Sequence, residues 1–294
     1  MAFPTIRNSH TPFVFAPGME FAPESPLRTL GREALESLRR RPTWPRIWAA
    51  AEFAGRARIF TKRQLVRAAL HDMRWQAAGE FVRRLVRLTI LYRWGWREGG
   101  GREWTQFSRD LWGLGLDLGG ARLLGWGKDR VLVPQDITEA LGACVASEIL
   151  SWLWVQGRRP DRWVALARKG EARAAASAAA GAAVYVILAP RGTDEETLEE
   201  TARQMVLWRE EALRARARAA LLVVAERERT AQMIEERASG KLGEFPRLYS
   251  TDSRIMTMRP WERGAWLAPG RGGFVEVRLS AFGPRREERE AAGK

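Results

Sequence analysis

The hydrophobic pattern changes its period near residue 158, and this change divides the chain into two differently built parts. Before this point apolar residues recur at spacings of three and four, as on the buried face of a helix. Beyond it they fall in short alternating or β-branched runs bounded by turn residues. With 294 residues, 46% of them hydrophobic, the chain is long enough for two domains with a core each. The sequence therefore predicts an α+β protein of two domains.

Imidazole and thiol groups are almost absent. His10, His71 and Cys144 are the only residues of these two types in the chain. Tetrahedral zinc sites draw mainly on such ligands, and one cysteine cannot form a disulfide within a chain. Cys144 lies in an apolar helical pattern and is interpreted as a small buried hydrophobe. We predict no metal site and no cofactor.

The charge of the chain is strongly basic and uneven. The formal net charge is +14, and residues 1–110 carry 20 Lys and Arg against 10 Asp and Glu. A positive field of this kind favours polyanionic partners such as nucleic acid. Residues 56–102 alone contain 12 Lys and Arg against 3 Asp and Glu. We expect double-stranded DNA as the partner.

The basic segment contains helical patterns followed by a hairpin pattern. Residues 26–55 are predicted to be helical, and Thr61 can cap a short helix over residues 62–70. A longer helix is predicted over residues 74–88, with one apolar and one basic face. Its inward positions are Ala78, Phe81, Val82, Leu85 and Leu88.

A strand at residues 90–96, a glycine-rich turn and a return strand at 103–107 complete the pattern. This order is typical of a winged helix-turn-helix, whose second helix enters the major groove while its hairpin touches the DNA backbone. The predicted DNA contacts are Arg74, Gln76, Arg83, Arg84 and Arg87 on the helix, and Arg93, Arg97 and Arg102 on the hairpin.

Other interpretations of this segment remain open. The arginines can solvate the outer face of an ordinary helical domain, and winged helices also dock proteins. Trp94, Trp96 and Trp104 of the hairpin can stack on unpaired bases or pack across the strands.

The second part of the chain has a βββαβ order. Strands are predicted at residues 161–166, 171–177, 184–189 and 219–225. Thr193, with Glu196 three residues later, is predicted to cap the long helix that precedes the fourth strand. Such an order is typical of the restriction-endonuclease-like, or PD-(D/E)xK, α/β core, in which carboxylates hold a divalent metal.

Three short motifs carry a resemblance to a known family. They are Arg159-Pro160-Asp161, Arg191-Gly192-Thr193 and the apolar run at residues 219–224. With the preceding winged helix they resemble the replication-relaxation family of plasmid and integrative-element proteins, over about residues 40–235. The resemblance implies a DNA-binding protein of a plasmid or mobile element that acts in replication, mobilisation or its control. It also implies a relaxase or replication protein as a partner.

The chain departs from that family at the catalytic positions. In the register of the second motif, the two acidic positions of the family fall on Leu188 and Pro190, and its basic position falls near Gln204. Asp161 alone remains as a remnant catalytic candidate, and one carboxylate is a poor holder of Mg²⁺. We therefore predict a degenerate nuclease-like domain that serves as a scaffold and is not an enzyme.

The alternative to this prediction is a metal-dependent endonuclease in which carboxylates at other positions of the sequence bind the metal. Glu171 and Glu195 are the candidates for this role.

The remaining segments complete the predicted organisation. The longest uncharged stretch, residues 174–190, is interpreted as a buried strand and not as a membrane span, and the absence of a signal-like apolar run predicts a cytoplasmic protein. The predicted parts are an extended arm (1–25), the winged helix-turn-helix (26–110), a helical connector (111–157), the nuclease-like domain (158–253), and a C-terminal strand and tail (254–294).

Overall fold

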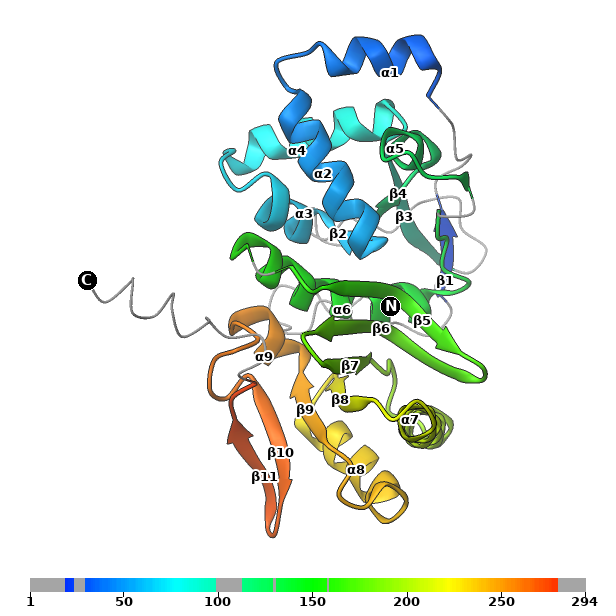
Figure 1. Ribbon diagram of the computed structural model, residues 1–294, viewed down its shortest axis with the longest axis vertical. Coiled ribbons are helices and arrows are strands. Elements are labelled where there is room, and N and C mark those ends of the chain that lie inside the picture. Colours follow the sequence, from blue (N-terminus) through cyan, green and yellow to red (C-terminus); the bar gives the residue numbers. More distant parts are fainter. Residues whose placement is uncertain (1–18, 24–29, 99–112, 129–130, 158, 280–294) are drawn as a thin grey trace, which may run out of the picture. The chain divides into compact units, whose positions relative to one another are not determined.

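The chain folds into two compact units, Met1–Val155 and Gln156–Lys294 (Figure 1). A computed structural model describes residues 19–23, 30–98, 113–128, 131–157 and 159–279. Within these residues it contains nine helices and two sheets, so the protein is mixed α+β.

The first unit combines helices with a small antiparallel sheet. The sheet has the order β1-β3-β4-β2. Its strands are β1 (Met19–Pro23), β2 (Ile59–Thr61), β3 (Leu91–Glu98) and β4 (Gly113–Leu116). The helices are α1 (Arg32–Arg39), α2 (Trp44–Ala57), α3 (Lys62–Ala69), α4 (Trp75–Arg87), α5 (Leu118–Leu123) and α6 (Ile137–Val155).

Local signals in the sequence locate the helices of this unit well. The Thr61 hydroxyl accepts a hydrogen bond from the Gln64 backbone N–H, and the Gln64 side chain accepts one from the Thr61 N–H. This reciprocal pair is a capping box and confirms the predicted start of α3 at Thr61. The predicted helix over residues 74–88 is confirmed as α4, with Ala78, Phe81 and Leu85 buried.

The strand that returns beside β3 differs from the prediction. β4 pairs with both β3 and β2, whereas the predicted return strand at 103–107 lies outside the described residues. β4 instead falls in the segment 111–157 that was predicted to be a helical connector. Its sequence, GLGL, lacks the β-branched residues that mark a strand, because glycine is needed opposite the aromatic rings of β3.

Trp94 is a core residue of this sheet. Its side chain is buried, and its indole N–H donates to the Leu114 carbonyl at 3.1 Å. Of the two alternatives left open by the sequence, packing across the strands is therefore the one that holds for Trp94, since its buried ring lies against Gly113 of β4 and cannot reach a base. The side chain of Trp96 and the whole of Trp104 lie outside the described residues.

α6 also belongs to the first unit and not to a connector. It is buried along most of its length, and the Ser147 hydroxyl donates to the Ile59 carbonyl of β2 at 2.6 Å. Glu139 donates its backbone N–H to the Asp136 side chain at 2.8 Å, which caps the start of the helix.

The second unit is built on a seven-stranded sheet of order β11-β10-β9-β8-β7-β6-β5. The three central strands are parallel, and the flanking pairs are antiparallel. The strands are β5 (Arg162–Lys169), β6 (Ala172–Ala180), β7 (Ala183–Leu188), β8 (Arg218–Ala225), β9 (Arg247–Thr251), β10 (Trp266–Gly270) and β11 (Gly273–Val277). The helices are α7 (Glu195–Arg214), α8 (Glu228–Leu242) and α9 (Asp252–Thr257).

The core of this unit lies between the sheet and the helices α7 and α8 (Figure 1). Met205 and Ile234, one from each helix, are buried in the same cluster as Val186 and Leu221 of the strands. The four strands of the predicted βββαβ order are confirmed as β5, β6, β7 and β8.

The N-cap of α7 is one residue later than predicted. The side chain of Asp194, and not that of Thr193, accepts a hydrogen bond from the backbone N–H of Thr197 at 2.8 Å. Aspartate is among the best N-cap residues, so it replaces the Thr193–Glu196 pair expected from the sequence.

The described helices include none that is both long and apolar enough to cross a lipid bilayer. The uncharged stretch at residues 174–190 forms most of β6 and all of β7, as a strand and not as a helix.

The close contact between Gly115 and Tyr92 gives a stability prediction. These residues pair across β3 and β4, and a Cβ at Gly115 would lie 2.3 Å from ring carbons of Tyr92. The ring cannot move away easily, because it is buried and its hydroxyl donates to the Leu132 carbonyl at 2.8 Å. We expect Gly115→Ala to lower the free energy of unfolding by about 1–3 kcal/mol in urea titrations.

A matched control is Gly240→Ala in α8, where an added Cβ meets no atom within 4 Å. This change should raise stability by about 0.5–1 kcal/mol, because alanine is the better helix former. Equal effects of the two substitutions would contradict the packing argument.

Candidate nucleic-acid interface

α4 presents one buried and one exposed face. Its apolar residues pack inward, whereas four polar residues, spaced by four, three and four positions, form one exposed line along the helix. We call this line the α4 stripe: Gln76, Glu80, Arg83 and Arg87.

The α4 stripe contains one arginine that is paired and one that has no ion pair in the described part of the chain. Arg83 forms an ion pair with Glu80 at 2.9 Å, and both side chains are about half exposed, so the pair is weak. Arg74 is exposed at the N-cap of α4, and Arg84 is half-buried beside the stripe. Within the described residues, Arg74, Arg84 and Arg87 make no ion pair. These side chains are available to bind an external anion.

Two contacts position the start of α4. Arg46 of α2 donates two hydrogen bonds, at 2.7 and 3.1 Å, to one carboxylate oxygen of Asp72 in the turn between α3 and α4. The same guanidinium holds the pKa of Asp72 below its usual value. Lys62 of α3 places its ammonium 4.0 Å from the centre of the Trp75 ring.

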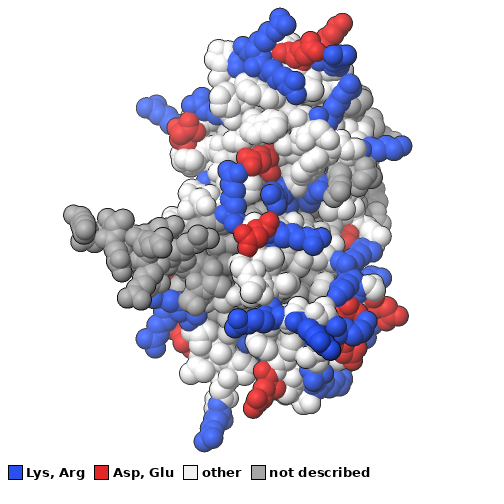
Figure 2. All heavy atoms as spheres, in the orientation of Figure 1, with Lys and Arg blue, Asp and Glu red and all other residues white. Residues whose placement is uncertain are grey.

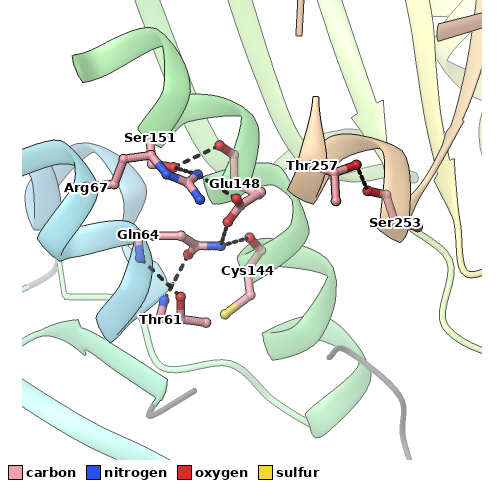
Figure 3. Close-up of polar contacts among 8 residues, drawn as sticks. All are labelled: Thr61, Gln64, Arg67, Cys144, Glu148, Ser151, Ser253 and Thr257. Carbon is pink, nitrogen blue, oxygen red and sulfur yellow. Dashed lines mark hydrogen bonds and ion pairs between the residues drawn. The ribbon is translucent and has the colours of Figure 1, made fainter. Parts of the chain in front are cut away.

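A buried polar network fastens α3 to α6 (Figure 3). The Gln64 amide donates to the Cys144 carbonyl at 2.8 Å and to the Glu148 carboxylate at 2.9 Å. Arg67 pairs with the other Glu148 oxygen and donates to the Ser151 hydroxyl at 2.9 Å. Glu148 is buried, so its charge depends on these donors. The network holds α3, the helix that precedes α4, in one position.

The predicted contacts of the hairpin are less well described than those of α4. Arg93 lies on β3 and is half-buried. The side chain of Arg97 and the whole of Arg102 lie outside the described residues. Of the five predicted residues of the helix, the structure places Gln76, Arg83 and Arg87 on one exposed line, Arg74 at the N-cap and Arg84 half-buried beside the line, and it does not describe a basic hairpin.

The remnant catalytic candidate Asp161 is separated from the second family-like motif. It is exposed, and its carboxylate accepts the Gly181 backbone N–H at 2.8 Å, in the turn before β7. Arg191 follows the other end of β7, which is six residues long. At about 3.3 Å per residue, the two ends of this strand are roughly 20 Å apart.

The alternative carboxylates are paired with arginines. Glu171 lies 3.7 Å from Arg203, and Glu195 lies 2.6 Å from Arg237. No group of three or more His, Cys, Asp or Glu within the described residues is arranged to hold a metal ion.

The carboxyl edge of the parallel strands holds a charged cluster that the sequence reasoning missed. Arg191, Glu226 and Asp252 each follow one of the strands β7, β8 and β9. Arg191 and Asp252 form an ion pair at 2.6 Å, with both side chains 0% exposed. Arg191 also donates to the Val224 carbonyl at 2.9 Å. The available signal was positional, since Arg191 and Glu226 come just after predicted strands.

Burial controls the titration of this cluster. Loss of hydration raises the pKa of Asp252, and the Arg191 charge opposes this shift. Desolvation likewise raises the pKa of Glu226, which accepts the Gly192 backbone N–H at 3.1 Å. The second carboxylate oxygen of Asp252 is buried without a partner among the described residues. The cluster fixes the ends of three strands.

No protein-family model, no curated protein and no solved structure matches this chain. The functional interpretation therefore rests on the residues and contacts described above. The resemblance to the replication-relaxation family stays a prediction.

The buried pair gives a second stability prediction. Asp252→Asn removes the carboxylate that is ion-paired with the buried Arg191, and we expect a loss of about 3–5 kcal/mol in chemical denaturation. The double variant Arg191→Met with Asp252→Leu removes both charges and should recover most of that loss. A single variant within about 1 kcal/mol of the wild type would contradict the role of this pair.

Glu226 gives a prediction about pH. Because its pKa is raised in the folded protein, the ionised side chain opposes folding above that pKa. Glu226→Gln keeps an acceptor for Gly192 and removes the charge, so it should be more stable than the wild type at neutral pH. Below about pH 4 the acid is protonated in both states, and the difference should vanish in thermal unfolding scans.

Proposed function

We propose that this chain is a double-stranded DNA-binding protein of a plasmid or mobile element, acting in replication, mobilisation or its control. The first unit is a winged helix-turn-helix whose helix α4 lies in the major groove. The observation that carries the proposal is the exposed α4 stripe with its flanking arginines, on a helix whose other face is buried.

The order of elements supports the winged-helix assignment. Helix α2, the short strand β2, helices α3 and α4, and strands β3 and β4 follow one another, with β4 between β2 and β3 in the sheet. In a helix-turn-helix the second helix contacts base edges and the first crosses the backbone. α3 and α4 are separated by a five-residue turn that Asp72 ties to α2.

Dimensions and charge support DNA as the partner. An α-helix with side chains is about 10–12 Å wide, which matches the roughly 12 Å width of the major groove. Arginine forks bind phosphate oxygens with two hydrogen bonds, and each such interaction releases condensed counterions. Figure 2 shows that basic side chains outnumber acidic ones on the face drawn.

The second unit is, in this proposal, a degenerate restriction-endonuclease-like scaffold that docks a relaxase or a replication protein. Its βββαβ order supports this assignment. Leu188 and Pro190 stand where that resemblance places carboxylates, and neither side chain binds a metal or accepts a proton. The proposed role therefore includes no catalytic step.

The α4 arginines provide the test. The triple variant Arg83→Ala, Arg84→Ala, Arg87→Ala should weaken duplex binding by about 100-fold or more, since each charge-assisted hydrogen bond is worth about 1.5–3 kcal/mol. The slope of log affinity against log salt should fall by about 0.9 for each phosphate that the variant no longer neutralises. Fluorescence anisotropy over a salt series measures both quantities, and circular dichroism verifies the fold.

A matched control is Arg39→Ala, Arg40→Ala, Arg41→Ala, which removes the same charge from exposed positions at the end of α1. This variant should change affinity only slightly. Equal decreases in affinity for the two variants would overturn the assignment of the α4 face, and strand cleavage on addition of Mg²⁺ would overturn the non-catalytic role.

A further inference from the structure

The first turn of α4 carries an exposed aromatic residue that the charge pattern does not account for. Trp75 is the first residue of the helix, and it is 40% exposed. It lies on the flank of the α4 stripe that faces α3, because Lys62 of α3 contacts its ring. Large exposed aromatic surfaces are unfavourable in water and frequently mark binding sites.

The Trp75 ring is held in place before any partner arrives. The Lys62 ammonium lies 4.0 Å from the ring centre, and the Lys62 side chain is itself buried. Gly79, one turn along α4, lies beside this ammonium, since a Cβ there would be 3.5 Å from it, in ordinary van der Waals contact. A side chain that is already fixed loses little conformational entropy on binding.

Gln76, the next residue, begins the α4 stripe and is exposed. The first turn of α4 contains no acidic residue, so nothing in it repels a nucleic acid. Glutamine can form two hydrogen bonds with the N6 and N7 atoms of adenine, and apolar side chains contact the thymine methyl group in the same groove.

Gln76 and Arg87, the two ends of the α4 stripe, are too far apart to contact the same base pair. Gln76 and Arg87 are eleven positions apart on the helix, which is about 16 Å at a rise of 1.5 Å per residue. In a helix-turn-helix the N-terminal residues of the recognition helix contact the base edges. When Gln76 does so, Arg87 lies more than two helical turns further along α4 and is free to contact the DNA backbone.

We propose that the first turn of α4 reads a step containing an A·T base pair, with Gln76 on adenine and Trp75 against a thymine methyl group. The arginines at the other end of the helix bind phosphates and carry no sequence information. This inference rests on the proposed function and assigns its specificity to Trp75 and Gln76.

Selection from a random-sequence duplex library tests the assignment. The full-length wild-type protein should enrich sites with an A·T-containing step. Gln76→Ala and Trp75→Ala should lose that preference while keeping the salt dependence of binding. The matched control is Trp48→Ala, which removes a tryptophan of equal exposure, 40%, from α2 and should leave the preference unchanged.

Modified DNA tests the same interactions without altering the protein. In the selected site, 7-deazaadenine removes the N7 acceptor, one of the two proposed hydrogen bonds, and should weaken wild-type binding by about 2- to 12-fold, the range for one hydrogen bond. Deoxyuridine in place of thymidine removes one methyl group and should weaken binding about fourfold. Gln76→Ala should be insensitive to the first change, and Trp75→Ala to the second.

The outcomes separate this inference from the proposed function. If the wild type binds duplexes with a steep salt dependence but enriches no sequence, or if Trp75→Ala and Gln76→Ala keep its preference, the inference is overturned and the DNA-binding role stands. If the wild type binds no duplex even at low salt, the proposed function fails, and the inference fails with it.

Discussion

The buried contact of α3 with α6 is the interaction on which the proposed DNA-binding surface depends. Gln64 uses its carbonyl oxygen to cap α3 and its amide nitrogen to bind α6, so one fully buried side chain fixes both the start and the position of the helix. Arg67 neutralises Glu148 in the same interface. Removal of Arg67 would leave the buried Glu148 carboxylate without its ion-pair partner. α4 follows α3 after a short turn, so the orientation of α4 depends on how this interface holds α3.

The α4 stripe is a mixed surface and not a simple basic patch. Glu80 lies between Gln76 and Arg83 and holds the Arg83 guanidinium in an exposed ion pair. Such a pair contributes little to stability, but it orients the guanidinium group of Arg83. An approaching phosphate competes with Glu80 for Arg83, whereas Arg87 has no competing carboxylate among the described residues. In the proposed DNA-binding role, the arginines of this face would therefore contribute unequally.

The parts of this structure that sequence could predict are the local ones. The apolar spacing in α4 and the capping signal at Thr61 each reside within one helix, and both predictions are confirmed. β4 was missed because its glycines are explained only by the rings of β3, more than twenty residues away in the case of Tyr92 and Gly115. The Arg191–Asp252 pair joins residues 61 positions apart, and the periodicity of the hydrophobic residues does not indicate contacts between such distant positions. The α4 stripe was predictable because residues three or four positions apart in a helix lie on the same face.

At the carboxyl edge of the sheet in the second unit, one buried ion pair occupies the place where such sheets commonly bind ligands. Open α/β sheets commonly bind ligands beyond the carboxyl ends of their parallel strands. Here that edge is occupied by the guanidinium of Arg191, which binds Asp252 and the Val224 carbonyl and is buried by them. A metal at this place would have to displace a fully buried charge from its partner, which costs several kcal/mol. The remaining motif residue, Asp161, lies at the opposite end of β7, so the two motifs of the second unit do not meet at one edge of the sheet.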